Sequence, residues 1–267
     1  MLNIRSLIIT LFVILHLSGL MIAQSGEEPS KRLRVVTYNI ASANNVDRET
    51  EINKISQLIS QVNPDLVAFQ GIENSLQRSG DELLIKYIAE KVGFNMAAIQ
   101  PYENQEPKNR IGILSRYPIR QKATMRIADD NDGSPRYLLG VEITHPVIGA
   151  ITFGSVEIDD APDTDNPVLQ AQAINRAFQD DTRNKAMIAC TIFAKPKSKT
   201  VKALRENWED ASKDYEQLTY PASNPSIKAD YIFLKKNSPW RVLASRIMYT
   251  ININDHLPLV LDLEWTE

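Results

Sequence analysis

The chain lacks the cysteines with which small exported domains are cross-linked: among its 267 residues the only one is Cys190. A single thiol excludes an internal disulfide, although it says nothing against export. With 43% hydrophobic and 24% charged residues, the composition is that of an ordinary globular protein. A chain of this length can bury a sizeable core without covalent cross-links.

An excess of positive charge is also missing. The 30 lysines and arginines are outnumbered by 33 aspartates and glutamates, so the formal net charge is −3 at pH 7. Non-specific binding to nucleic acid depends on Lys and Arg facing phosphates, so we do not expect nucleic acid as a partner. The one candidate basic cluster, Lys185 with Lys195–Lys199, is interpreted as a solvated loop.

A long apolar run occurs only near the N-terminus. Arg5 precedes an almost wholly apolar stretch from Leu7 to Leu17, and Ala23 offers a small residue for cleavage. This pattern predicts a secretory signal peptide over residues 1–23 and a linker over residues 24–31. The alternative is a membrane anchor, but residues 6–23 are only 18 positions long and are interrupted by polar residues. We therefore expect an exported protein, periplasmic or extracellular, with no stable membrane span after signal cleavage.

Apolar periodicity then predicts strands and helices in alternation. A β-branched run over residues 33–40 indicates a buried strand, and Asp47 is the expected N-cap of a helix that ends at Asn63. A second helix over residues 81–92 is expected to stop at Gly93. Further strands are predicted over residues 66–69, 95–98, 111–115, 137–144, 150–156, 186–190, 230–234, 242–249 and 259–263, with a helix over 167–178.

Two batches of strands with helices between them indicate a β-sandwich covered by helices on its outer faces. No repeat and no low-complexity linker divides the chain after the N-terminal segment, which predicts one domain over residues 32–267.

Short motifs in a fixed order run through that region. They are Thr37-Tyr38-Asn39-Ile40, Asn63-Pro64-Asp65-Leu66-Val67-Ala68-Phe69-Gln70, Ile113–Ile119, Pro135-Arg136, Ala229–Phe233 and Asn254-Asp255-His256. Together they resemble the endonuclease/exonuclease/phosphatase family of metal-dependent phosphoester hydrolases. The resemblance implies an α/β fold, a DNase I-like four-layer α/β/β/α sandwich.

The same resemblance implies a set of retained site residues. Asn39 matches the Asn that orients a catalytic carboxylate, and Asp230 matches an active-site Asp. Asp255 and His256 match a terminal pair in which the Asp orients the His. From the residues alone, Asp255 and His256 could equally be a buried hydrogen-bonded pair that ties the last strand, and Asn39 a core amide with its hydrogen bonds satisfied.

Four other positions depart from the family pattern. Gly71 stands where the resemblance implies a Glu that is the principal Mg²⁺ ligand, and Val156 where it implies a His that contacts the scissile phosphate. Thr191 and Phe193 replace the Asp that activates water and the Asn that helps to bind phosphate.

Loss of the implied Glu removes the anchoring carboxylate that Mg²⁺ needs, because this ion requires oxygen ligands in near-octahedral geometry. Asp255 and Glu73 are the remaining candidate metal ligands. Glu73 lies two residues after Gly71 and thus on the same strand face, whereas Glu157 would need a shift of register to reach the site.

We weigh three functions. The first is an exported, catalytically impaired relative whose cleft binds a phosphorylated or carbohydrate ligand or a protein partner, with no cofactor. The second is an active phosphodiesterase or phosphatase with relocated metal ligands, which would use Mg²⁺; the third is a scaffold with an empty cleft. Elsewhere, Trp208 and Trp240 are expected to pack in the core, and His145 is expected to face solvent.

Overall fold

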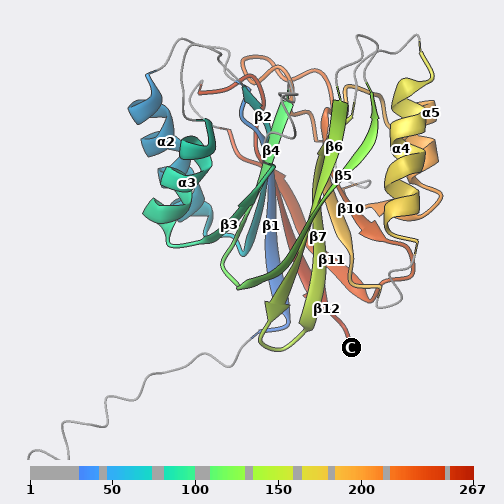
Figure 1. The fold of residues 1–267 in the computed structure, drawn as a ribbon, viewed down its shortest axis with the longest axis horizontal. Coiled ribbons are helices and arrows are strands. Elements are labelled where there is room, and N and C mark those ends of the chain that lie inside the picture. The colour runs from blue at the N-terminus through green and yellow to red at the C-terminus, as the bar shows by residue number, and fades with distance from the viewer. Residues whose placement is uncertain are drawn as a thin grey trace, which may run out of the picture. The chain divides into compact units, whose positions relative to one another are not determined.

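A computed structural model describes residues 30–41, 47–73, 81–99, 109–129, 135–158, 164–179, 184–212, 217–249 and 253–267. Residues Lys31–Glu267 form one compact unit. It consists of two six-stranded sheets packed face to face, with helices on both outer faces (Figure 1). The fold is a DNase I-like α/β sandwich, as predicted.

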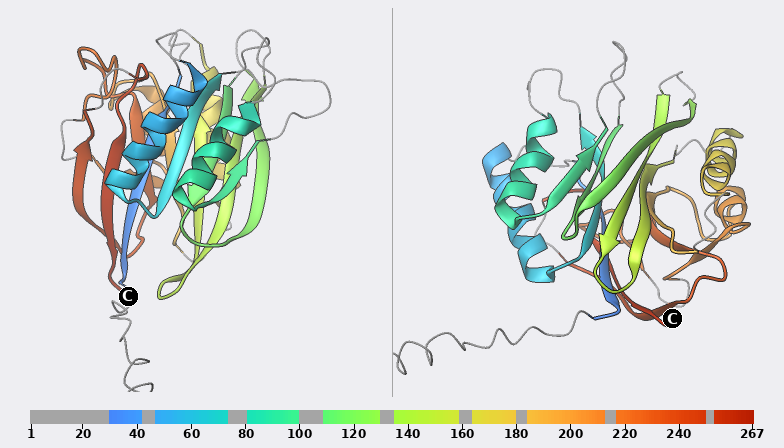
Figure 2. Two further views of the ribbon diagram at one scale, coloured as in Figure 1. Left: turned by 90° about the vertical axis from the view of Figure 1, so that its left-hand side faces the viewer. Right: turned by 60° about the horizontal axis from the view of Figure 1, so that its bottom comes forward.

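The first sheet has the strand order β11-β12-β1-β2-β4-β3. Its strands are β1 (Arg32–Asn39), β2 (Leu66–Glu73), β3 (Asn95–Ala98), β4 (Asn109–Ser115), β11 (Trp240–Ile247) and β12 (Leu259–Trp265). β1 and β2 are parallel neighbours, and the other pairings are antiparallel. Helices α2 (Arg48–Val62) and α3 (Asp81–Val92) cover its outer face (Figure 2).

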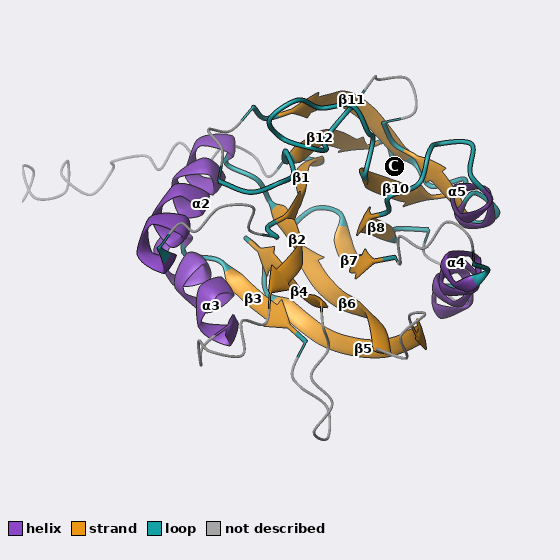
Figure 3. Cartoon of the chain, turned by 90° about the horizontal axis from the view of Figure 1, so that it is seen from above, coloured by secondary structure: helices purple, strands orange, loops and turns teal. Residues whose placement is uncertain are grey.

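The second sheet has the order β5-β6-β7-β8-β10-β9. Its strands are β5 (Ile119–Asp129), β6 (Pro135–His145), β7 (Gly149–Glu157), β8 (Met187–Thr191), β9 (Trp208–Asp210) and β10 (Asp230–Lys235). Here β7 and β8 are the parallel neighbours. Helices α4 (Asn166–Ala177) and α5 (Lys199–Leu204) lie outside this sheet, so that the view from above shows helices, sheet, sheet and helices in succession (Figure 3).

Local chemistry explains where the first helices begin and end. The Asp47 side chain accepts a hydrogen bond from the Thr50 backbone N–H and caps α2. Asn63 ends this helix in the left-handed conformation at φ +51°, and Gly93 follows α3 at φ +73°. Both residue types tolerate a positive φ, as the predicted helix ends required.

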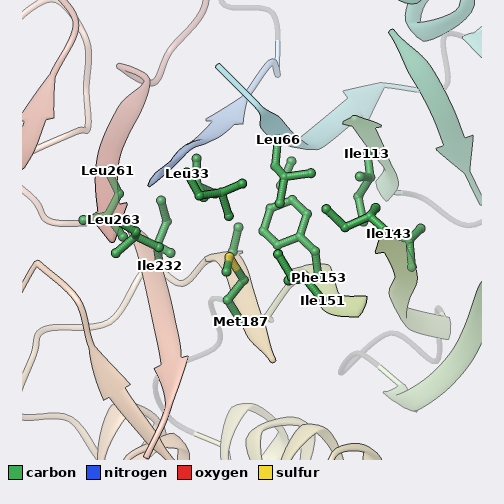
Figure 4. Close-up of a cluster of buried hydrophobic side chains, with 14 of the residues drawn as sticks. Leu33, Leu66, Ile113, Ile143, Ile151, Phe153, Met187, Ile232, Leu261 and Leu263 are labelled. Carbon is green, nitrogen blue, oxygen red and sulfur yellow. The ribbon is translucent and has the colours of Figure 1, made fainter. Parts of the chain in front are cut away.

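Side chains that alternate along each central strand fill separate cores. In β1, Leu33 and Val35 point into the core between the sheets, whereas Val36 and Tyr38 pack against the helices. The core between the sheets is shown in Figure 4, where Phe153 lies among aliphatic side chains from both sheets. Because both faces of these strands are covered, they read as continuous apolar runs in the sequence.

Several expectations were wrong. β5, α5 and β9 were not predicted, because β5 carries a run of exposed polar residues and the other two are short. His145 is buried rather than solvent-facing: its Nδ1 accepts hydrogen bonds from the backbone N–H groups of Val147 (3.2 Å) and Ile148 (3.1 Å). Burial lowers the pKa of this imidazole.

The basic cluster is only partly a solvated loop. Lys195 and Lys197 are exposed, but Lys185 donates to the Ile148 carbonyl at 2.6 Å and lies 4.9 Å from the centre of the Trp265 ring. Lys185 thus lies in a loop, as expected, but its side chain is only partly exposed to solvent. Trp208 and Trp240 are buried in the core, as predicted. In the described part of the chain, no helix has the length and hydrophobicity to cross a membrane.

Candidate functional site

The candidate site lies where the two parallel strand pairs end. β1 and β2 of one sheet and β7 and β8 of the other present their carboxyl ends at the same edge of the sandwich, visible from above in Figure 3. Hydrogen bonds between side chains join the two sheets there: Asn39 of β1 bonds to Thr191 of β8, and Gln70 of β2 bonds to Ser155 of β7. The topology thus brings together residues that are far apart in the sequence.

Three of the four expected site residues form one buried chain of hydrogen bonds. Asn39 Nδ2 donates to Thr191 Oγ1 (3.3 Å), and Thr191 Oγ1 donates to Asp230 Oδ1 (2.7 Å). The other oxygen, Asp230 Oδ2, lies 2.8 Å from His256 Nδ1. A carboxylate held against Nδ1 fixes the orientation of an imidazole, which is the arrangement of a general acid or base. The catalytic role of these residues remains a prediction.

Aromatic side chains cover His256. The Phe193 ring lies 5.3 Å from the His256 ring in an edge-to-face arrangement, and the Tyr220 ring lies 4.8 Å from it. Phe193 and Tyr220 also contact each other at 5.0 Å. His256 is only 1% exposed and Asp230 is fully buried, and the Phe193 and Tyr220 rings form an aromatic layer packed against the imidazole.

Asp255, the fourth expected residue, does not orient His256; Asp230 does so instead. The Asp255 backbone ties two loops together, because its N–H donates to the Ala41 carbonyl (3.3 Å) and its carbonyl accepts from Ala222 (2.7 Å). The pairing of Asp255 with His256 that the resemblance implied was therefore wrong, because the carboxylate against the imidazole comes from Asp230 of β10.

Gly71 occupies a position that no side chain can share with Asn39. Its φ is +62°, and a Cβ placed on it would lie 2.1 Å from Asn39 Oδ1. The Asn39 carboxamide is held there because Oδ1 accepts from the Ala41 N–H at 2.9 Å. Asn39 therefore fills the space into which a residue 71 side chain would begin.

Val156 does not face the site. It is buried in the core beneath α4 and α5, together with Ile188 and Ile174. Alternation along β7 instead directs Ser155 and Glu157 toward the other sheet, where Ser155 accepts from Gln70 Nε2 at 3.1 Å. The assignment of Val156 to the position of a phosphate-contacting His was wrong by one residue.

Glu157 reaches the site without the expected shift of register, because the ladder between β7 and β8 is regular up to its pairing with Thr191. Its Oε2 accepts from the Gly71 N–H at 3.2 Å, and its Oε1 accepts from Arg136 Nη1 at 3.1 Å. The two side chains are 13% and 12% exposed. Burial raises the pKa of the Glu157 carboxyl, and the Arg136 guanidinium and the Gly71 N–H oppose that rise.

Arg136 is the site residue that sequence reasoning missed. It follows Pro135 at the start of β6, in a dipeptide that the family resemblance marks as a motif without assigning it a role. The pairing of β6 with β7 is the signal that could have found it. Leu138 pairs with Val156 in the antiparallel ladder, so the start of β6, where Arg136 lies, is opposite the end of β7, where Glu157 lies.

The site side chains that the structure describes do not form a ligand set for a divalent metal. Among the residues that the structure describes, no group of three or more His, Cys, Asp or Glu side chains is placed to hold an ion. Asp230 is bonded to Thr191 and His256, and Glu157 is bonded to a guanidinium. The backbone of Glu73 lies at the end of β2, but its side chain is outside the described residues.

A family model, the endonuclease/exonuclease/phosphatase family, matches residues 36–245. No curated protein sequence matches the chain. A solved endonuclease/exonuclease/phosphatase from Bacteroides vulgatus superimposes with a TM-score of 0.72 at 16% identity, covering 88% of this chain and 99% of that one. A mannosyl-6-phosphatase of Bacteroides thetaiotaomicron (TM-score 0.66, 15% identity) covers 86% of this chain and 99% of its own. The human Nocturnin catalytic domain with a bound sulfate anion (TM-score 0.65, 13% identity) covers 89% and 96%.

Proposed function

The chain belongs to the endonuclease/exonuclease/phosphatase family, and from this premise we propose that it is an exported, catalytically impaired member. We propose further that the end of the sandwich at β1, β2, β7 and β8 serves as a binding site for a phosphorylated or carbohydrate ligand. The observation that carries the proposal is the burial of Asp230 and His256 beneath Phe193 and Tyr220. A general base acts only within hydrogen-bond reach of the proton it removes.

The lack of a cluster of metal-ligating side chains in the described part of the chain supports the same conclusion. Phosphoryl transfer develops negative charge that a bound ion or fixed cations must stabilise. Here the carboxylate that accepts from the Gly71 N–H belongs to Glu157, and it is paired with Arg136. The likeness to a mannosyl-6-phosphatase and to a domain with a bound sulfate supports a ligand that carries an anionic group.

Assays of the chain from residue 24 onward test the impairment. We expect no hydrolysis of bis-p-nitrophenyl phosphate or mannose 6-phosphate above the buffer rate with Mg²⁺ or Mn²⁺, and no metal-dependent rise in Tm, because a ligand raises Tm only if it binds the folded state. Metal-dependent turnover that His256→Ala abolishes would overturn the proposal.

One observation favours the second candidate, an active metal-dependent phosphoesterase with a relocated ligand. Glu157 brings a carboxylate to the Gly71 N–H, close to where the resemblance implies a metal-binding Glu. If this enzyme exists, Glu157→Ala should abolish its turnover, and Arg136 must move away from the carboxylate when the metal binds.

Export has its own test. The apolar N-terminal segment motivates the proposal, and it lies outside the described residues. Expression of the full chain in a bacterial host, followed by N-terminal sequencing of the product outside the cytoplasm, should find cleavage near residue 23. A full-length product that stays in the cytoplasm would contradict export.

A further inference from the structure

Two donors to the Glu157 carboxylate come from different sheets. Arg136 belongs to β6 of the second sheet, and the Gly71 N–H belongs to β2 of the first. They bind different oxygens of one carboxylate, at 3.1 and 3.2 Å. A guanidinium and a backbone N–H that converge in this way form a receptor for an oxyanion.

We propose that Arg136 and the Gly71 amide form an oxyanion cradle, and that the Glu157 carboxylate is its built-in occupant, which an oxyanion group of a ligand displaces. The inference rests on the proposed binding role of this end of the sandwich and names the chemical group that it would take. Glu157 thereby competes with the ligand and lowers its apparent affinity.

The surroundings fit exchange of one oxyanion for another. The Arg136 and Glu157 side chains keep 12% and 13% of their surface exposed, whereas Asp230, which lies on the far side of β8 from Glu157, is fully buried. Glu157 is the last residue of β7. Its side chain can therefore turn away from Arg136 and Gly71 while the backbone pairing of β7 with β8 stays intact up to Val156. Desolvation opposes the charged form of Glu157, which reduces the cost of its departure.

The conformation of Gly71 keeps its N–H available to this cradle. With φ at +62° and the Asn39 carboxamide where a Cβ would lie, no residue 71 side chain crowds the oxyanion. Residue 71, where a glycine stands in place of the metal-binding Glu that the resemblance implies, is thus suited to binding an anion.

The cradle can be tested by removing the Glu157 carboxylate and supplying a free oxyanion in its place. Glu157→Ala should be less stable than wild type, and formate or inorganic phosphate, compared with chloride at equal ionic strength, should restore its Tm. An anion at about ten times its Kd raises the Tm of a domain of this size by about 3–6 °C. Wild type should respond less, because its own carboxylate competes.

Two controls separate the cradle from general salt effects. Glu264→Ala removes a partly exposed carboxylate that pairs with Arg241 and Arg32 and should show no anion-specific shift. Adding Arg136→Gln to Glu157→Ala should abolish the response. If Glu157→Ala responds no more than Glu264→Ala, the cradle does not exist and the pair only ties the sheets together.

If Glu157→Ala does not fold in chloride, Glu157→Gln preserves the side-chain volume. In that variant, formate should shift the NMR signal of the Arg136 Nε–H and leave that of the exposed Arg116 unchanged; equal shifts would refute the cradle. A stronger effect of formate indicates a carboxylate ligand, and a stronger effect of phosphate a phosphorylated one. These outcomes are independent of the hydrolysis assays, because no turnover is measured.

Discussion

A methyl group at residue 71 should destabilise the protein far more than one at an equivalent glycine elsewhere. In Gly71→Ala the new Cβ would lie 2.1 Å from Asn39 Oδ1, at a φ of +62°. The left-handed conformation costs about 1–2 kcal/mol for a residue with a Cβ. Asn39 must also withdraw from the Ala41 N–H and Thr191, and a buried polar group left unsatisfied costs about 1–3 kcal/mol.

The free energy of unfolding should therefore fall by about 2–5 kcal/mol, measured by urea denaturation with an unchanged m-value. Gly149→Ala is the matched control: its φ is +82°, but no atom lies within 4 Å of the added Cβ. It should lose only the cost of the backbone conformation, about 1–2 kcal/mol.

A double-mutant cycle identifies the cause. When Asn39→Ala removes the carboxamide, adding Gly71→Ala should cost less than it does in wild type and should exceed the cost of Gly149→Ala only by the remaining 3.0 Å contact with the Ala41 Cβ. Equal losses for Gly71→Ala and Gly149→Ala in the wild-type background would show that Asn39 does not occupy the space beside Gly71. The same clash predicts that Gly71→Glu cannot restore a metal site by itself.

Three further outcomes are expected. Burial lowers the pKa of His145 in the folded protein, so the neutral imidazole contributes stability above a pH of about 6.5, and this contribution is lost as the pH falls through the lower folded-state pKa. His145→Asn should therefore flatten the pH dependence of Tm in that range. An unchanged slope would contradict this expectation. Lys228→Ala breaks a buried ion pair with Asp210 and should lower the free energy of unfolding, measured in denaturant, by about 3–5 kcal/mol. Lys86→Ala breaks an exposed pair with Glu90 and should lower it by less than about 1 kcal/mol. Similar losses for the two variants would refute this expectation. Phe193→Ala should expose His256 and speed its modification by diethyl pyrocarbonate, and an unchanged rate would show that the aromatic layer does not shield it.

The sequence predicts the framework well where one local signal dominates. Asp47 and Gly93 mark helix ends through hydrogen-bonding and backbone preferences that act within a few residues. β5 was missed because, as an edge strand, it buries little of either face and shows no alternation.

The site was harder to predict because it depends on which face of a strand each side chain lies on and on partners that are distant in the sequence. The choice between Val156 and Glu157 is a matter of one residue in a strand, and a one-residue error reverses the face. Asp255 stands next to His256 in the chain, but the contact is made by Asp230 from another strand. Arg136 pairs with Glu157 only because β6 and β7 are neighbours, which no local pattern reveals.

The order of the strands contains a duplication that the amino-acid sequence does not show. In each sheet a parallel pair, joined through a helix, is flanked on either side by two antiparallel strands: β1 and β2 with α2 in one half, β7 and β8 with α4 in the other. Asn39 at the end of β1 thus corresponds to Glu157 at the end of β7. Each half also has its own core beneath its own helices. Two topologically equivalent halves therefore each contribute side chains to the site, and either half can change its contribution while the other preserves the frame on which both depend.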